Sequence, residues 1–232
     1  MAKIRGGALA AQISGSIAGQ VFSHNRYGPY VRNRAIPVTS TTEYALGAKQ
    51  KFSECSQAWQ ALAASEQDAW RTWADVNLTP DVFGVPQALS GQAAFVQLGV
   101  RLLICGSALP TLPPVATSPL GLTTLTGEWD IGPGDFHLTF TPTPLGANDR
   151  LWSWAAVMDT AGKRYVKNLL KLVDISAAEL ATGYDLQSAI EVRFGDLSVG
   201  QVVHVECQVC SDLSGEISGR RKVVGTVIDS TV

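Results

Sequence analysis

The spacing of hydrophobic residues changes twice along this chain of 232 residues. At the start, two short extended runs of mixed polarity, Ile17–Ser23 and Tyr30–Val38, flank the stretch HNRYG, which is rich in turn-forming residues. A disordered tail and a nucleic-acid-binding arm are alternatives, but this pattern favours a β-hairpin. Because a lone hairpin is marginally stable in water, we expect it to pack on another surface.

The second region has apolar residues at helical spacing, which predicts three helices. We expect the first to be capped by Thr41 or Thr42, the second by Ser65 in a capping box with Asp68, and the third by Ser90. The predicted buried stripes are Phe52, Cys55, Trp59 and Leu62 on the first helix, Trp70, Trp73 and Val76 on the second, and Phe95, Leu98, Leu102 and Cys105 on the third, before a stop at Gly106.

The third region follows SALPTLPPVATSP, whose prolines predict a stiff extended linker. Beyond it the period changes to two, and turn residues separate runs of four to ten residues, which is typical of an antiparallel β-sandwich with six or seven strands. The less regular insert SAAELATGYDLQSAIEVRFG includes a candidate helical turn. The predicted strands are GLTTLTGEW, DFHLTFTP, RLWSWAAVM, RYVKNLLKLV, GQVVHVECQV and RRKVVGTVI.

These patterns together predict an α+β fold with four parts. They are a basic N-terminal β-hairpin arm at residues 1–40, a small three-helix region at 41–106, a Pro-rich linker at 107–119 and an antiparallel β-sandwich at 120–232.

Charge is unevenly distributed along the chain. Charged residues make up 16% of the sequence, well below the roughly 25% of ordinary soluble domains, which fits either a surface partly covered by other proteins or a β-rich domain. The net charge of −2 divides into +5 for residues 1–50 and −7 for the rest. This division predicts a polyanionic partner for the arm, or docking of the arm on an acidic neighbour.

The arm carries the candidate partner-binding residues Arg26, Tyr27, Tyr30, Arg32 and Arg34. On a strand, the last two arginines point to the same side, where they can meet carboxylates of a neighbouring subunit or phosphates. Protein contact is favoured over nucleic acid because the arm has no nucleic-acid recognition fold. A merely solvated hairpin face remains open as well.

A second candidate surface lies on the predicted strand RLWSWAAVM, where Trp152 and Trp154 share one face. Leu151, Ser153 and Ala155 share the other face, and either face can be the one in the core. If the face of smaller residues is buried, the exposed tryptophan pair marks a binding surface, for example for a sugar.

The sequence predicts no enzyme, cofactor site or metal site. Cys207 and Cys210 form a CxxC motif, but on a strand they point to opposite faces, so we expect buried, inert thiols. Asp130 and Asp135 in DIGPGD suit a β-turn better than a calcium site. The three histidines share no ligand spacing, and there is neither a nucleophile elbow nor a phosphate-binding loop.

Localisation is predicted from the same sequence. It has no run of 18 apolar residues that would span a membrane, and the apolar run Ala8–Ala11 is too short for a signal peptide. We therefore expect synthesis in a cytosol and no membrane partner.

The stretch IAGQVFSHNRYGPYVRNRAIPVTSTTEY resembles a segment of uncharacterised proteins of tailed bacteriophages and prophages, which have a Gly-rich start, a YSRN-x-x-G-x-YVR stretch and PVNPNT. The order of boxes continues with SQAWQAL, SEQDAWRTWA, LSGQAAF and LPP, so the motifs cover about residues 14–115. In the family a domain similar to fibronectin type III follows, so the resemblance implies a sandwich of fibronectin type III or immunoglobulin type at 120–232. This remainder is similar in architecture only. Asp68 replaces a basic residue of the family pattern, and Gly99 stands near a common Asn.

This resemblance implies a virion structural protein made in the host cytoplasm, without fixing its place in the virion. We expect a head decoration, cement or connector-type component that binds capsid, portal or tail subunits through its arm and helices. The alternative is a tail-associated adhesion module whose sandwich holds a glycan or a host receptor.

Overall fold

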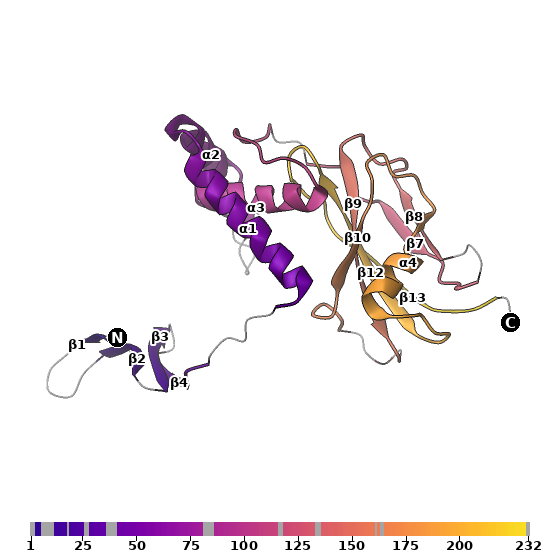
Figure 1. The fold of residues 1–232 in the computed structure, drawn as a ribbon, viewed down its shortest axis with the longest axis horizontal. Helices are drawn as coiled ribbons and strands as arrows, with labels where there is room; N and C mark the ends of the chain where they lie inside the picture. Colours follow the sequence, from indigo (N-terminus) through magenta and orange to yellow (C-terminus); the bar gives the residue numbers. More distant parts are fainter. Residues whose placement is uncertain are drawn as a thin grey trace. The chain divides into compact units, whose positions relative to one another are not determined.

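A computed structural model gives the fold (Figure 1) and describes residues 3–5, 12–17, 19–25, 28–35, 41–80, 86–115, 118–132, 136–160, 162 and 165–230. The chain divides into two compact units, residues 1–46 and 47–232. The predicted boundary at 107–119 therefore lies inside the second unit. The α+β class is confirmed, with helices and antiparallel sheets in one chain.

The first unit contains an antiparallel sheet with the strand order β1-β2-β3-β4. The predicted hairpin is present as β3 and β4, but its first strand begins at Gln20, because Ile17 ends β2 and pairs with Gln20. The predicted second strand extends into residues 36–40, which lie outside the described residues. The strands are β1 (Lys3–Arg5), β2 (Gln12–Ile17), β3 (Gln20–Asn25) and β4 (Gly28–Asn33).

The three predicted helices are present as α1 (Glu43–Ala61), α2 (Ala64–Val76) and α3 (Gly91–Cys105). As predicted, Ser90 caps α3 by accepting a hydrogen bond from the Ala93 N–H at 3.2 Å, and Gly106 ends it at a φ of 80°. The predicted capping box of Ser65 and Asp68 is wrong, because α2 begins before Ser65. Glu66 Oε2 accepts from the Ala63 N–H at 2.8 Å, and the methyl side chain of Ala63 returns no bond.

The helices enclose an aromatic core in which the Trp70 ring meets Phe95 edge-on with 5.2 Å between centroids. Cys55 and Trp59 of α1 are buried there as predicted. Phe52 and Val76 were predicted to be buried but are 60% and 76% exposed, because they lie at ends of their stripes beyond the packed part of the helix.

The Pro-rich segment is attached to α2 by hydrogen bonds. The indole N–H of Trp70 donates to the Thr111 carbonyl at 3.0 Å, and that of Trp73 donates to the Pro114 carbonyl at 3.1 Å. Between α2 and α3, β5 (Thr79–Pro80) pairs with β6 (Pro86–Gln87).

The C-terminal half contains two antiparallel sheets, with the orders β10-β9-β12-β13 and β11-β8-β7. One core cluster takes side chains from both, such as Phe140 of β8, Leu151 of β9 and Val205 of β12, so the sheets face each other across it. The strands are β7 (Thr124–Gly127), β8 (His137–Thr141), β9 (Asp149–Met158), β10 (Lys171–Ile175), β11 (Tyr184–Asp185), β12 (Val202–Ser211) and β13 (Arg221–Thr226).

The structure corrects two local predictions for this half of the chain. The run RYVKNLLKLV was predicted to be a strand throughout, but β10 starts only at Lys171 and a turn occupies Lys167–Leu169. The irregular insert contains a full helix, α4 (Gln187–Phe194), which places Ile190 in the core between the sheets.

Candidate functional site

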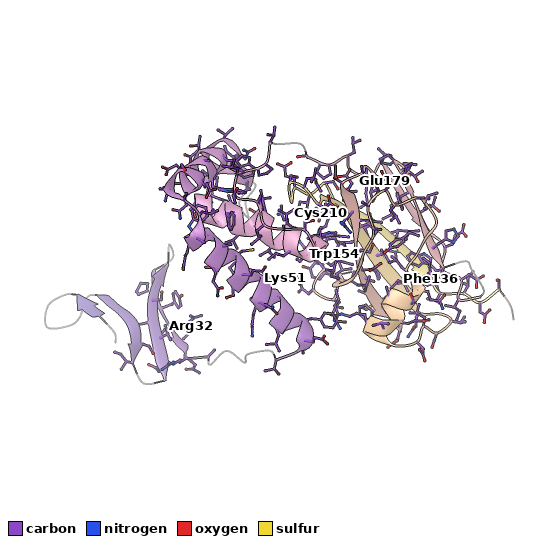
Figure 2. All side chains as sticks on the ribbon, turned by 45° about the horizontal axis from the view of Figure 1, so that its top comes forward. Arg32, Lys51, Phe136, Trp154, Glu179 and Cys210 are labelled. Carbon is purple, nitrogen blue, oxygen red and sulfur yellow. The ribbon has the colours of Figure 1, made fainter. Side chains whose placement is uncertain are left out.

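The described part of the predicted arm site lies on β4, which is the terminal strand in the order of its sheet. Tyr30 and Arg32 point to the same face, next to Ser23 and Val21 of β3 in the strand register. Tyr30 is 40% exposed, and Arg32 and Arg34 are exposed as well. Figure 2 labels Arg32 on this sheet. Arg26 and Tyr27 lie outside the described residues.

The opposite face of this sheet carries both apolar and polar groups. Val31 is 53% exposed and pairs with the half-buried Phe22, and the exposed Gln20 and Asn33 pair beside them. We refer to Tyr30, Val31, Arg32 and Arg34 as the β4 surface. It offers cations and an aromatic ring on one side and a branched aliphatic group on the other.

Backbone pairing holds the β4 surface in place. All six residues of β4 are in register with β3, and the Arg34 N–H donates to the Gly19 carbonyl at 2.7 Å just beyond the strand. This bond extends the pairing past Asn33, so Arg34 keeps the orientation that the strand gives to Arg32. Tyr30, Arg32 and Arg34 follow one another along one segment, so strand periodicity was enough to predict that they share a face.

The tryptophan face of β9 is covered rather than open. Trp152 is 7% exposed, and its indole N–H donates to the Cys105 sulfur of α3 at 3.3 Å. The Trp154 ring lies 4.4 Å from the guanidinium of Arg220, which also contacts Glu206 at 3.4 Å. The hypothesis of an exposed tryptophan pair is therefore wrong for Trp152, because α3 packs on this face while Leu151 and Ala155 face the other core.

Sequence reasoning missed this contact between α3 and the sheet. The Arg101 guanidinium donates to the Gly215 carbonyl at 3.2 Å, and Cys105 lies 3.9 Å from Cys210, sulfur to sulfur. The signal that could have found it is the composition of α3, where Val96 is buried on the side opposite to the buried Ala94 and Cys105. A helix that is apolar nearly all round is typically covered on more than one side.

No protein-family model, curated protein or solved structure matches the chain. The resemblance to phage proteins thus stays a prediction.

The remaining candidate groups have ordinary structural surroundings. A hydrogen bond from the Ser230 side chain, together with those from the N–H groups of Gly132 at 2.9 Å and Ser230 at 3.1 Å, holds the pKa of the Asp130 carboxyl below its usual range. Asp135 lies outside the described residues. Burial and the charge of Lys222 lower the pKa of His204. Within the described ranges no group of three His, Cys, Asp or Glu side chains is placed to hold a metal ion, and no helix there has the length and apolarity to cross a membrane.

Proposed function

We propose that this chain is a structural protein of a tailed-bacteriophage virion that attaches to neighbouring subunits through its N-terminal unit. The observation that carries the proposal is the β4 surface, which exposes two arginines, a tyrosine and a valine along the strand at the end of its sheet. Exposed apolar groups on an edge strand are typical of a surface that a partner covers.

The proposed attachment works by strand addition. A strand of the partner pairs with the outer backbone of β4, its apolar residues cover Val31, and its carboxylates meet Arg32 and Arg34. The arginines fix the register because a shift by one residue turns the carboxylates to the opposite face. A head decoration, cement or connector-type component fits this mode of binding best.

For residues 120–232 we propose an immunoglobulin or fibronectin type III sandwich. Lettering β7 to β13 as A, B, C, C′, E, F and G turns the two strand orders into E-B-A and C′-C-F-G. This order keeps the C-F-G pairing of immunoglobulin sheets, with the insertion α4 between E and F. A sandwich of this type would act as a rigid spacer in the virion.

The alternative of a tail-associated module that holds a glycan or receptor depended on an open tryptophan pair. Trp152 is buried beneath α3, and Arg220 lies over the Trp154 ring. The same sheet face therefore gives a sugar little flat aromatic surface to stack on, and we favour attachment through the arm.

The proposal is tested by sedimenting the protein with its virion, with and without residues 1–40. We expect the full chain to sediment with the particles and the truncated chain to stay in the supernatant while keeping its far-UV circular dichroism. Undiminished incorporation of the truncated chain would refute the proposal.

A double substitution separates the arginines from the rest of the arm. Arg32→Ser with Arg34→Ser is expected to reduce incorporation at least tenfold, since each exposed charge pair is worth about 0.2–1 kcal/mol and loss of register removes further contacts. The matched control removes two exposed cations of the second unit, Arg71→Ser with Lys222→Ser, and should sediment like the unaltered chain. Binding of the arm to free duplex DNA that weakens steeply with salt would instead indicate a nucleic-acid partner.

A further inference from the structure

Two cysteines from distant parts of the chain lie side by side in the second unit. Cys105 is the last residue of α3, and Cys210 is the ninth residue of β12, where it faces α3 (Figure 2 marks Cys210). Their sulfur atoms are 3.9 Å apart and share a hydrogen bond. A disulfide needs a sulfur–sulfur distance of about 2.05 Å, so a movement of about 2 Å would join them.

The surroundings of this pair favour a reactive thiolate on Cys105. The hydrogen bond with Cys210 has the largest effect on the pKa of Cys105 and lowers it. The Trp152 N–H and the charge of Arg150 lower this pKa further. Together they outweigh burial, which raises it, and the pKa of Cys105 is about 7. The same hydrogen bond and burial raise the pKa of Cys210. One sulfur is thus prepared to act as the nucleophile, and its neighbour keeps a proton.

The other two cysteines have the opposite character. Burial raises the pKa of Cys55 to about 11 and that of Cys207 to about 12, and both side chains are fully buried. Cys207 lies in the core between the two sheets, on the other side of β12 from Cys210. These two thiols serve as internal controls for reactivity within the same chain.

We propose that Cys105 and Cys210 form a peroxide-responsive disulfide site that fastens α3 to β12. The Cys105 thiolate attacks one oxygen of hydrogen peroxide, which forms a sulfenic acid and releases hydroxide. The sulfur of Cys210 then attacks the Cys105 sulfur, and the sulfenic oxygen leaves as water once the thiol proton has been transferred. In sum, two thiols are oxidised by two electrons and one peroxide is reduced to two waters.

Peroxide suits the site because the site is nearly closed. Cys105 is 7% exposed and Cys210 is fully buried, so a small oxidant reaches the thiolate more easily than a bulky disulfide does. The bond would close a loop of more than a hundred residues and connect the helices to the sheet. It should therefore stabilise the second unit without altering how the two elements pack.

The experiment treats the reduced full-length chain with a small excess of hydrogen peroxide, blocks the remaining thiols under denaturing conditions, and maps peptides without reduction. We expect a cross-linked peptide pair containing Cys105 and Cys210, with a mass about 2 Da below the sum of the two. Cys55 and Cys207 should be found alkylated. The melting temperature should rise by about 5–15 °C and return to its starting value after reduction.

This measurement on the unaltered chain decides the proposal without any variant having to fold. Recovery of all four cysteines as alkylated thiols, or a cross-link through Cys55 or Cys207, would overturn it. As a second test, Cys210→Ser should leave the Cys105 sulfenic acid open to a carbon-acid trapping reagent, whereas Cys207→Ser should still form the cross-link. The site is independent of the proposed virion role, so either proposal can fail alone.

Discussion

At the scale of single residues, Trp129 is tightly fitted, because its ring lies against glycines from both sheets. A Cβ atom added at Gly225 of β13 would lie 1.8 Å from Cδ1 and Nε1 of Trp129, and one added at Gly127 of β7 would lie 2.5 Å from Cζ2. The ring also meets Phe136 edge-on at 5.2 Å, so it has little room to withdraw.

We therefore predict that Gly225→Ala lowers the free energy of unfolding by about 2–3 kcal/mol, because the methyl group forces Trp129 out of its site. Gly219→Ala is the matched control, since a Cβ there would meet no heavy atom within 4 Å, and it should change stability by less than about 0.5 kcal/mol. Urea denaturation followed by tryptophan fluorescence measures both. Equal midpoints for the two variants would contradict the packing described for Trp129.

At the residue scale, the sequence predicts the side to which a residue points but not what it meets there. The alternation in β12 correctly placed Cys207 and Cys210 on opposite faces. It could not show that Cys105, far away in the chain, would lie against Cys210, because a strand period contains no information about distant segments. Exposure of Phe52 and Val76 was missed for the same reason, since a helical stripe does not tell where its partner helix ends.

Among the elements, α3 connects the helical core to the sheet. It contributes Phe95 to the aromatic core of the helices and Cys105 to the cluster with Trp152 of β9. Its backbone approaches the loop after β12 so closely that a Cβ at Gly215 would lie 2.7 Å from the Leu98 carbonyl oxygen.

The contact between α3 and this loop can be tested with two glycines of similar conformation. Gly215 and Gly200 have φ angles of 71° and 90°. A Cβ atom added at Gly215 would meet Leu98, whereas one added at Gly200 would meet no heavy atom within 4 Å. Gly200→Ala should cost about 1 kcal/mol through backbone strain, whereas Gly215→Ala should cost about 3 kcal/mol because α3 must also move.

Amide hydrogen exchange provides the specific measurement. In Gly215→Ala we expect faster exchange in the peptide that covers residues 91–105, and in Gly200→Ala we expect no change there. If both variants left the exchange of α3 unchanged, the helix would not depend on this loop for its protection.

The sequence predicted the elements better than their arrangement. Helix signals such as the Ser90 cap and Gly106 stop are local, and they located α3 correctly. The prolines of residues 107–119 suggested separation of helices and sheets. Instead, Trp70 and Trp73 donate hydrogen bonds to carbonyl groups of this segment. Every residue type has a backbone carbonyl, so the sequence could not predict these bonds.

For the whole molecule, we predict that residues 47–232 unfold in one cooperative transition. The reason is that α3 shares buried side chains with both the helical core and the sheet. Cys55 and Cys207 report on the two regions separately, since each is fully buried in one of them. Pulsed thiol labelling along a urea series should give the same midpoint for both cysteines, within about 0.2 M.

Removing residues 1–46 provides the control, and it should leave both midpoints unchanged because these residues form a separate compact unit. Two distinct midpoints for Cys55 and Cys207 would show that the segment 107–119 is a domain boundary after all. A parallel shift of both after removal of residues 1–46 would show that the N-terminal unit stabilises the second one.

The bond between Arg101 and Gly215 spans 114 residues, and this separation has a consequence for synthesis. The helices leave the ribosome long before the loop that covers α3 exists, so the apolar side of α3 stays open while the whole sheet is being made. Native contacts of such long range slow folding and prolong the time in which an incomplete chain can aggregate. A chaperone that holds the nascent helices during this interval would therefore raise the yield of folded protein.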